Sequence, residues 1–371
     1  MTAPLKADPP DPLLARADAL LAWRPPVRLA ARAPRVRWIQ SLTGGCEQWL
    51  GSDTPPGAVL TCARGTHRVQ MSEHILAALF LCAKDLAGIV LDQAQSRWRR
   101  RINPTLAGAT LGILGLGAIG VEVARLAAAL DMRVIGTKRE PTAIPHVAHV
   151  YPPAETTRVL AESDYVLLLL PSTAETRGIL DTSALARLKP SAFVLNFGRG
   201  DLVVDADLVE AVRGRRIAGA VLDVFTTEPL PPEHPFWTTP GIVVLPHVGG
   251  LHPTRDTIVA SLWVDNLRRF LAGQPLLQVV GEAVGILQAF DVAARPRIAI
   301  PEPGAADARA RLVGPHLEAH AAQAMDGIEA GQAAADDGDI ELAFVGGMRC
   351  WTMRSVRHFS GVPVLFLLCE R

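Results

Sequence analysis

Three segments that follow predicted strands each carry one side chain able to take part in catalysis. They are Arg199 in Asn-Phe-Gly-Arg-Gly, Glu228 in Phe-Thr-Thr-Glu-Pro-Leu and His247 in Leu-Pro-His-Val-Gly-Gly. An arginine can hold a carboxylate through two hydrogen bonds, and a histidine can exchange a proton with a carbonyl or hydroxyl oxygen near neutral pH. A glutamate can accept the other imidazole N–H and favour the charged ring. Together the three residues predict binding and reduction of a 2-oxo acid beside a hydride donor.

Each of these residues also has a plain structural interpretation. Arg199 can be a charge flanking a helix, Glu228 a turn residue before proline, and His247 an ordinary loop histidine. Ligands of open α/β sheets bind beyond the carboxyl ends of the strands, and acid/base groups gather in such crevices. Because all three residues stand at successive strand ends, we favour the catalytic interpretation. The other nine histidines, His252 included, are given no catalytic role, and we expect no metal site.

A glycine-rich turn earlier in the chain predicts the cofactor site. Residues 110–114 are apolar, and an alanine-rich amphipathic run and a second apolar run follow the turn up to residue 136. This order is strand, tight turn, helix and strand, the arrangement of a dinucleotide-binding unit. The helix N-terminus offers free N–H groups and positive dipole to the phosphates. The predicted cofactor contacts here are Gly115, Gly117, Ala118, Ile119 and Gly120.

The end of the second strand indicates which dinucleotide binds. An NAD site normally has an acidic residue there, whereas the 2′-phosphate of NADP attracts a cation. The chain has Thr137-Lys138-Arg139 at this place, which favours NADP(H) over NAD(H). Two alternatives stay open: Lys138 and Arg139 can belong to a solvated loop, and Glu140 can reach a ribose.

Strands alternate with helices through most of the chain, which predicts an α/β protein with a doubly wound parallel sheet. Residues 71–90 are predicted to form one buried helix, and residues 253–271 a long helix ended by Gly273. The predicted domains are a first part of a substrate domain (1–100), a dinucleotide-binding Rossmann domain (101–265), a return helix and linker (266–290) and a C-terminal α/β segment (291–371).

The composition favours a small-molecule partner. The 371 residues include 37 basic and 37 acidic side chains, so no global field attracts nucleic acid or a membrane surface. The five cysteines form no metal-like spacing and predict reduced, mostly buried thiols of a cytoplasmic protein. The longest apolar runs have the length of strands, and the N-terminus does not resemble a signal peptide.

Six ordered motifs resemble the D-isomer-specific 2-hydroxyacid dehydrogenase family, and within it the chain is similar to NADPH-dependent glyoxylate/hydroxypyruvate reductases. They are residues 38–45, the glycine turn 115–120, Pro-Ser-Thr-Ala-Glu-Thr at 171–176, Asn-Phe-Gly-Arg-Gly at 196–200, Leu-Asp-Val-Phe-Thr-Thr-Glu-Pro-Leu at 222–230 and Leu-Pro-His-Val-Gly-Gly at 245–250. The resemblance implies a Rossmann domain, a flavodoxin-like substrate domain and a homodimer formed through the nucleotide-binding domains.

The resemblance also assigns roles to individual residues. It makes Arg199, Glu228 and His247 the substrate-binding arginine, the acid that supports the histidine and the acid/base. It places Asp223 at the nicotinamide amide and the backbone of Gly44 and Gly45 at the substrate carboxylate. The remaining implied cofactor contacts are Pro171 and Thr176, beside the nicotinamide ribose, and Gly249 and Gly250.

The chain departs from the family pattern at both ends. Family members have a strand and helix ahead of the segment that matches Arg16–Trp23, and they end near the segment that matches Val280–Leu287. One hypothesis is circular permutation, in which residues 295–371 supply the missing first strand through Ile298–Ile300. The other is a small appended domain. Expected elements here are a strand at 298–300, a helix at 306–323 and strands at 340–345 and 362–368.

Two other functions stay open. Because both ends of the chain depart from the family pattern, it can also be a dehydrogenase-like binding or regulatory protein that uses the dinucleotide as a signal. The side-chain specificity depends on loop shapes, so a biosynthetic dehydrogenase acting on a larger 2-oxo acid is a third reading.

Overall fold

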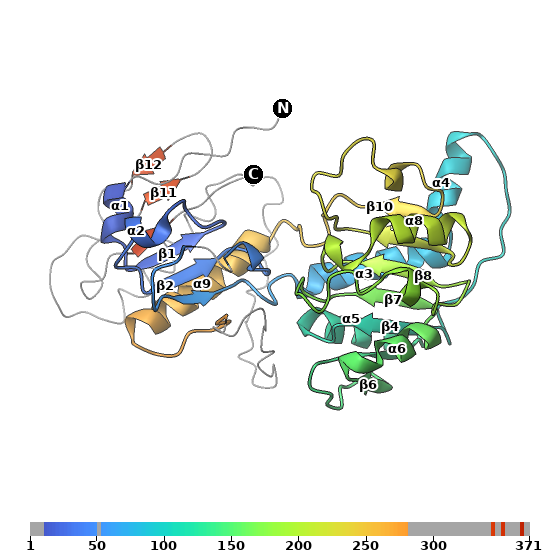
Figure 1. The fold of residues 1–371 in the computed structure, drawn as a ribbon, viewed down its shortest axis with the longest axis horizontal. Coiled ribbons are helices and arrows are strands. Elements are labelled where there is room, and N and C mark those ends of the chain that lie inside the picture. The colour runs from blue at the N-terminus through green and yellow to red at the C-terminus, as the bar shows by residue number, and fades with distance from the viewer. Residues whose placement is uncertain (1–10, 50–52, 281–342, 346–349, 353–363, 367–371) are drawn as a thin grey trace, which may run out of the picture. The chain divides into compact units, whose positions relative to one another are not determined.

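The computed structural model describes residues 11–49, 53–280, 343–345, 350–352 and 364–366 (Figure 1). The chain forms two compact units, and each is described by itself. The first unit contains residues 1–66 and 253–371, and the second contains residues 67–252. The chain passes from the first unit to the second after residue 66 and returns after residue 252. The domain boundaries predicted from the sequence lie instead at residues 100 and 265. The reason is that α3 (Arg68–Ala83) packs against α5 (Ala118–Ala128) of the second unit.

The second unit is built on a seven-stranded parallel sheet. Its strands are β4 (Thr110–Leu114), β5 (Arg133–Thr137), β6 (His149–Tyr151), β7 (Tyr165–Leu168), β8 (Phe193–Asn196), β9 (Gly219–Leu222) and β10 (Ile242–Val244). Their order in the sheet is β10-β9-β8-β7-β4-β5-β6, with every neighbouring pair parallel. The order reverses between β4 and β7, and this switch point is where doubly wound sheets bind ligands. The predicted Rossmann sheet is confirmed.

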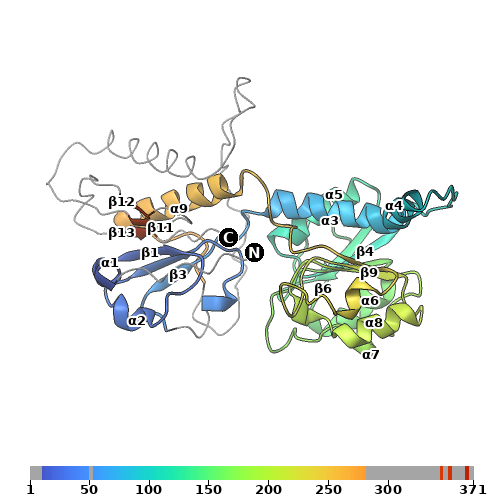
Figure 2. The same ribbon diagram turned by 90° about the horizontal axis from the view of Figure 1, so that it is seen from above.

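Helices cover both faces of this sheet (Figure 2). One face is covered by α3 and α5, whose buried side chains pack with those of β4, β5 and β7. The other is covered by α6 (Thr156–Glu162), α7 (Thr182–Leu185) and α8 (Asp205–Arg213). Residues on the central strand β4 are buried throughout, as expected for a strand covered on both faces.

The prediction of one buried helix over residues 71–90 is wrong. The chain breaks after α3, and α4 (Leu86–Ala94) begins at a 66° bend. Asp85 causes the break, because its backbone is left-handed (φ 46°) and its carboxylate caps α4 by accepting a hydrogen bond from the N–H of Gly88. The predicted burial also fails for α4, since Val90 and Leu91 are each 62% exposed.

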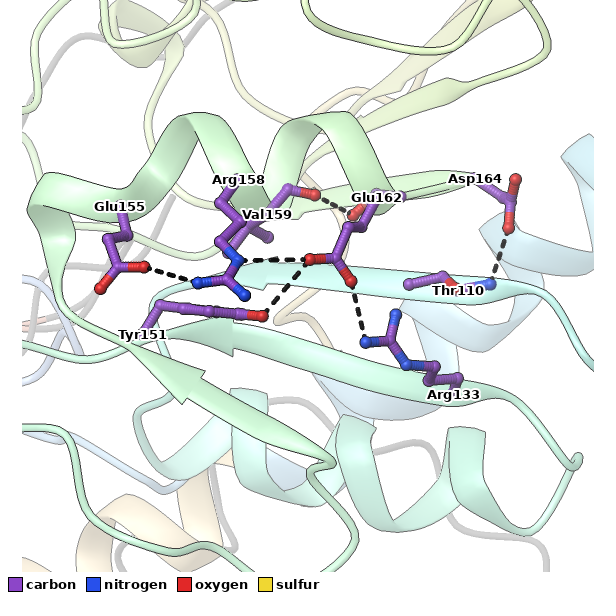
Figure 3. Close-up of polar contacts among 9 residues, drawn as sticks. Thr110, Arg133, Tyr151, Glu155, Arg158, Val159, Glu162 and Asp164 are labelled. Carbon is purple, nitrogen blue, oxygen red and sulfur yellow. Dashed lines mark hydrogen bonds and ion pairs between the residues drawn. The ribbon is translucent and has the colours of Figure 1, made fainter.

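The sequence interpretation missed β6 and α6, which are short and rest on side-chain contacts between elements. Glu162 of α6 accepts hydrogen bonds from Arg133 of β5 at 2.8 Å and from the Tyr151 hydroxyl of β6 at 3.3 Å (Figure 3). Arg158 lies over the Tyr151 ring, with its guanidinium carbon 5.0 Å from the ring centroid. These contacts join residues up to 29 positions apart, so no local pattern could reveal them.

The first unit contains a second parallel sheet, with the order β13-β1-β2-β3. Its strands are β1 (Ala19–Ala22), β2 (Trp38–Ser41), β3 (Val59–Thr61) and β13 (Val364–Phe366). Helix α9 (Arg255–Leu271) packs on one face of β1 and β2, while residues from α1 (Asp11–Arg16) and α2 (Leu29–Arg32) pack on the other. Alternate residues of β1 therefore face different layers of core.

The C-terminal part of the chain joins this sheet. Strand β13 pairs with β1 in parallel, with Leu365 opposite Leu20. Two further strands, β11 (Ala343–Val345) and β12 (Cys350–Thr352), form an antiparallel pair. The strand predicted at Ile298–Ile300 and the helix predicted at 306–323 lie outside the described residues. The permutation hypothesis therefore stays a prediction, with β13 as the strand that lies beside β1.

Among the described residues no single helix is long and apolar enough to cross a membrane; α3 and α4 satisfy that test only when taken together across their bend.

Candidate active site

Glu228 and His247 meet beyond the ends of β9 and β10. The Nδ1 atom of His247 lies 2.7 Å from Oε2 of Glu228. The other carboxylate oxygen of Glu228 accepts a hydrogen bond from the backbone N–H of Phe225 at 3.0 Å, which fixes the carboxylate. His247 has a left-handed backbone (φ 52°), uncommon outside glycine, and its side chain is about half exposed. The pair thus presents one ring nitrogen to Glu228 and leaves Nε2 for another partner.

The surroundings of Glu228 keep it ionised. Burial raises the pKa of its carboxyl, but the hydrogen bonds from His247 and Phe225 and the charges of His247 and Arg199 outweigh this and lower the pKa overall. An ionised carboxylate only accepts hydrogen bonds, so the proton between the two residues belongs on Nδ1 of His247. The arrangement suits an imidazole that gives or takes a proton at Nε2.

Asp223 holds the loop that carries His247. Its side chain is 1% exposed, and its two oxygens accept hydrogen bonds from the backbone N–H groups of Val248 and Gly249, at 2.8 and 3.0 Å. Burial raises the pKa of Asp223, although these two bonds and the charges of His247 and His74 favour its ionised form. Asp223 therefore acts as an anchor for the backbone next to His247, a role that the sequence interpretation did not include.

Arg199 lies in the loop after β8, which is shaped by two residues the sequence interpretation did not assign. Buried Asn196 donates to the carbonyl of Arg199 at 2.8 Å and accepts from the N–H of Gly198 at 3.1 Å. A Cβ at Gly200 would lie 1.9 Å from the carbonyl carbon of Phe225, so only glycine lets this loop approach the loop of Glu228. The signal available in the sequence was the asparagine and glycine flanking the arginine.

The guanidinium of Arg199 donates to the carbonyl of Gly198 at 2.7 Å. Its charge contributes to the lowered pKa of Glu228. The three residues predicted to be catalytic, Arg199, Glu228 and His247, are therefore brought to one end of the sheet.

The glycine turn after β4 fits a bound diphosphate. Gly115 has a left-handed backbone (φ 109°), and a Cβ at Gly120 would lie 2.6 Å from the Gly115 carbonyl oxygen. A Cβ at Gly117 would meet nothing within 4 Å, so the backbone there is open to an approaching ligand. Ala118 and Ile119 form the first turn of α5, whose N-terminus has no side-chain cap. First-turn N–H groups lack partners within a helix and suit phosphate oxygens.

Lys138 and Arg139 follow the end of β5. Arg139 is exposed, and Lys138 lies 3.4 Å from the Thr142 hydroxyl. The positive charge of Arg139 is one of the lesser causes that lower the pKa of Glu175; the largest is the hydrogen bond from Thr173. Exposed Arg139 and half-buried Lys138 offer two cations at this strand end that can bind a phosphate group.

Pro171 and Thr176 belong to one loop after β7. The hydroxyl of Thr176 donates to the carbonyl of Pro171 at 2.7 Å and accepts from the N–H of Thr173 at 2.8 Å. Both residues are partly exposed. Thr176 therefore holds the loop in shape, and its predicted contact with the ribose stays a prediction.

Two further pairs of glycines were predicted to contact ligand. Gly249 is buried beside Asp223, and a Cβ there would lie 2.7 Å from a carboxylate oxygen of Asp223. A Cβ added at Gly250 would lie 3.7 Å from the ring of His67. Gly44 and Gly45 lie in the loop after β2 of the first unit, where they are partly exposed. Their ligand contacts stay predictions.

Comparison with known proteins places this geometry in a family. The model for the NAD-binding domain of D-isomer specific 2-hydroxyacid dehydrogenases matches residues 76–249. Glyoxylate/hydroxypyruvate reductase A of Photorhabdus laumondii is 32% identical over 276 residues, covering 72% of this chain and 88% of the relative. The chain belongs to the D-isomer-specific 2-hydroxyacid dehydrogenase family. Its predicted resemblance to that family is confirmed.

Solved structures of the same family are similar in fold to this 2-hydroxyacid dehydrogenase. An NADPH-dependent glyoxylate/hydroxypyruvate reductase from Sinorhizobium meliloti, in complex with NADP and sulfate, is similar with a TM-score of 0.65 and 32% identity, over 72% of this chain and 86% of that one. A family member from Xanthobacter autotrophicus Py2, in complex with NADPH and MES, has a TM-score of 0.66 and 32% identity, over 71% and 83%. Among the described residues of the dehydrogenase, no group of three or more His, Cys, Asp or Glu side chains can hold a metal ion.

Proposed function

We propose that this dehydrogenase reduces small 2-oxo acids of the glyoxylate and hydroxypyruvate class with NADPH, and catalyses the reverse oxidation of the 2-hydroxy acids. The single observation that carries the proposal is the 2.7 Å contact between His247 and Glu228. It gives the chain an oriented acid/base at the ligand-binding end of a dinucleotide-type sheet. The names of its relatives support the substrate class.

His247 is the proton donor of the reduction. Its Nδ1–H bond to the Glu228 carboxylate orients the ring and fixes which nitrogen faces away from Glu228. The proton on Nε2 passes to the carbonyl oxygen as the carbonyl becomes a hydroxyl, and the neutral imidazole then recovers a proton from solvent. In the oxidation direction Nε2 accepts the hydroxyl proton. Glu228 stays ionised throughout and acts through His247.

Arg199 binds the carboxylate of the substrate. A guanidinium matches a carboxylate through two parallel hydrogen bonds, which orients the neighbouring carbonyl as well as holding the acid. The bond from Asn196 to the Arg199 carbonyl and the close approach at Gly200 fix the backbone that carries it. The assignment of the backbone of Gly44 and Gly45 to the same carboxylate remains part of this proposal.

The residues at the ends of β4 and β5 hold the cofactor. The open backbone at Gly117 and the uncapped start of α5 suit the diphosphate, and the cations Lys138 and Arg139 suit the 2′-phosphate that distinguishes NADP from NAD. When bound, the nicotinamide supplies the hydride. Asp223, Pro171, Thr176, Gly249 and Gly250 complete the proposed cofactor contacts, and NAD(H) is the weaker ligand.

The test follows NADPH absorbance with glyoxylate, hydroxypyruvate and phenylpyruvate in turn, and then repeats the series with NADH. Wild-type protein should oxidise NADPH with at least one acid, and His247→Ala should lose ~10²–10⁴-fold in kcat, the usual share of a general acid. NADPH binding without turnover by the wild-type protein would favour a regulatory, dinucleotide-binding role. Turnover with phenylpyruvate alone would favour a larger substrate.

The same proposal includes a homodimer formed through the second unit. On α4, the side chains of Leu86, Ile89, Val90 and Leu91 are between 42% and 62% exposed, and Leu86, Val90 and Leu91 line an apolar groove with Trp237. Contiguous apolar surface of this kind is typical of subunit interfaces. Sedimentation should show a dimer that Val90→Glu dissociates and that Val27→Glu, an exposed position of the first unit, leaves intact. The cytoplasmic location stays a prediction from the cysteines.

A further inference from the structure

One carboxylate of the second unit joins two loops that the proposed site uses for different ligands. Asp201 lies in η3 (Gly200–Leu202), two residues after Arg199, and its Oδ2 atom accepts a hydrogen bond from the hydroxyl of Ser172 at 2.5 Å. Ser172 belongs to the loop after β7 and directly follows Pro171. A hydroxyl and an ionised carboxylate form a short, strong hydrogen bond of this length. The loop of the proposed substrate arginine is therefore tied to the loop of proposed cofactor contacts.

Arg177 joins the same contact but is much more exposed. Its Nε–H lies 3.2 Å from Oδ2 of Asp201 and 3.4 Å from the Ser172 hydroxyl, so the two acceptors share one donor. The side chain of Arg177 is 69% exposed, whereas that of Asp201 is 30% exposed. Exposed ion pairs contribute little to stability, because water and salt screen them. The partly buried bond from Ser172 should therefore contribute most to the link between the loops.

Backbone hydrogen bonds continue the junction beyond these side chains. The N–H of Gly178 donates to the carbonyl of Asp201 at 2.8 Å, and the N–H of Leu180 donates to the carbonyl of Leu202 at 3.0 Å. Leu180 and Val203 are paired as a parallel bridge. The two segments therefore lie side by side from residues 178 and 201 onward, and a displacement of Asp201 would reach both loops.

Asp201 and Ser172 each lie close to the residues that they would position. The carbonyl of Arg199 accepts a hydrogen bond from the N–H of Leu202 at 3.3 Å, so Asp201 is part of the same tight turn as Arg199. Ser172 lies within the loop that the Thr176 hydroxyl closes through its bond to the carbonyl of residue 171. A change at either end of the bond between Ser172 and Asp201 would therefore be felt at the other.

We propose that Asp201 is a positioning residue that couples two ligand sites of the second unit, so that the dinucleotide and the 2-oxo acid strengthen each other's binding. This inference rests on the proposed function, in which Pro171 and Thr176 contact the cofactor and Arg199 holds the substrate carboxylate. A cofactor on the first loop orders Ser172, and the bond from Ser172 to Asp201 then holds the turn of Arg199. By linkage, a carboxylate on Arg199 tightens dinucleotide binding by the same factor.

The link between the loops is tested first, without ligand. Hydrogen exchange of the full-length protein, read by mass spectrometry, reports how readily backbone N–H groups open. Asp201→Ala and Ser172→Ala should each speed exchange roughly tenfold in peptides covering residues 172–180 and 199–204, because each loses a hydrogen bond to a charged group. Arg177→Ala removes only the exposed partner and should change neither peptide by more than about twofold. Faster exchange in only one of the two segments, or in neither, overturns the proposal.

The coupling is then measured with NADPH and the 2-hydroxy acid formed from the preferred substrate, which is glycolate for glyoxylate. This complex cannot turn over, because both ligands are in their reduced forms. The fluorescence of NADPH gives its Kd with and without the hydroxy acid. In the wild type the hydroxy acid should lower this Kd roughly fivefold or more, as is usual for coupled sites. In Asp201→Ala the two Kd values should agree within about twofold.

Two further variants separate coupling from a merely structural role. Asp201→Asn keeps an oxygen that accepts from Ser172 and should restore most of the wild-type ratio of the two Kd values, and Arg177→Ala should keep that ratio. If Asp201→Ala weakens NADPH but leaves the ratio unchanged, or if a wild type that reduces the 2-oxo acid has a ratio near one, the coupling is overturned. A wild type that binds no NADPH contradicts the proposed function itself, and the exchange data still decide whether Asp201 joins the loops.

Discussion

Two regions at the carboxyl ends of the strands of the second unit are built in opposite ways. The turn after β4 works through side chains that are missing, because Gly115, Gly117 and Gly120 leave space for tight backbone packing and for a ligand. The loops after β8, β9 and β10 work through side chains that are held, because Glu228 and Asp223 receive backbone N–H bonds from Phe225, Val248 and Gly249.

Because of this difference, the two regions should be sensitive to different kinds of substitution. In the glycine turn an added methyl group does harm by occupying space. In the loops after β8, β9 and β10, removing a single acceptor does harm by releasing a loop that positions a proposed catalytic side chain. Changes of one atom or one methyl group can therefore tell the two designs apart.

Of the changes that compare these two regions, Asp223→Asn is expected to have the largest effect. An amide can accept only one of the two N–H bonds, so one backbone N–H beside His247 loses its acceptor and the loop shifts. Because misplacing a catalytic group by ~1 Å can cost 10²-fold, kcat should fall about a hundredfold. Steady-state kinetics with NADPH and the preferred 2-oxo acid measure the loss.

Asp205→Asn is the matched control for this change. Asp205 is another carboxylate of the second unit that is removed in part from solvent, although less than Asp223, and it pairs with His234 at 3.3 Å. It starts α8, and none of its hydrogen bonds or ion pairs among the described residues is with a proposed catalytic residue. Its kcat should stay within about twofold of the wild type. Equal losses in both variants would show that Asp223 has no special positioning role.

Gly117→Ala and Gly120→Ala should fail for different reasons. At Gly117 the new methyl group meets no protein atom within 4 Å, so the melting temperature should stay unchanged while KM for NADPH rises by about tenfold. At Gly120 the methyl group would lie 2.6 Å from the Gly115 carbonyl, and overpacking of this kind costs ~1–3 kcal/mol of stability. Calorimetry and NADPH titration separate the two. A stable Gly120→Ala protein, or an unstable Gly117→Ala protein, contradicts the assignment.

A smaller effect is expected from Arg139→Ala. Loss of one exposed cation should raise KM for NADPH by about tenfold, ~1.4 kcal/mol, and leave KM for NADH unchanged, since only NADPH has the 2′-phosphate. Arg187→Ala removes another exposed arginine from the same unit and should change neither value. If Arg139→Ala weakens the binding of NADPH and NADH equally, Arg139 attracts both dinucleotides through its charge and does not select NADPH over NADH.

The sequence was informative where function depends on local pattern. Glycine spacing predicted the β4 turn and its helix, and the positions of Arg199, Glu228 and His247 at strand ends predicted which side chains would gather. It was silent about bonds between distant segments, such as Asp223 with Val248 or Arg133 with Glu162. It also misjudged α4, because apolar composition alone does not say whether another element of the chain packs over the helix, and Val90 and Leu91 are each 62% exposed.

The pairing of Glu228 with His247 also predicts a dependence of stability on pH. The pKa of Glu228 is lowered from its ordinary value of 4.5, so the native state holds fewer protons than the unfolded state just below that pH. The stabilisation from its ionised form is complete above about pH 4.5 and is lost as the pH falls through the lowered folded-state value.

Urea unfolding between pH 3 and 7 tests this dependence. The free energy of unfolding of the wild type should exceed that of Glu228→Gln, and the difference should shrink only in the acidic part of that range. Glu233→Gln, an exposed glutamate near η4 (Pro235–Trp237), controls for the added amide. A difference in the free energy of unfolding that stays constant down to pH 3 would mean that His247 does not stabilise the Glu228 carboxylate. The proposal that Glu228 orients His247 as the acid/base would then be wrong.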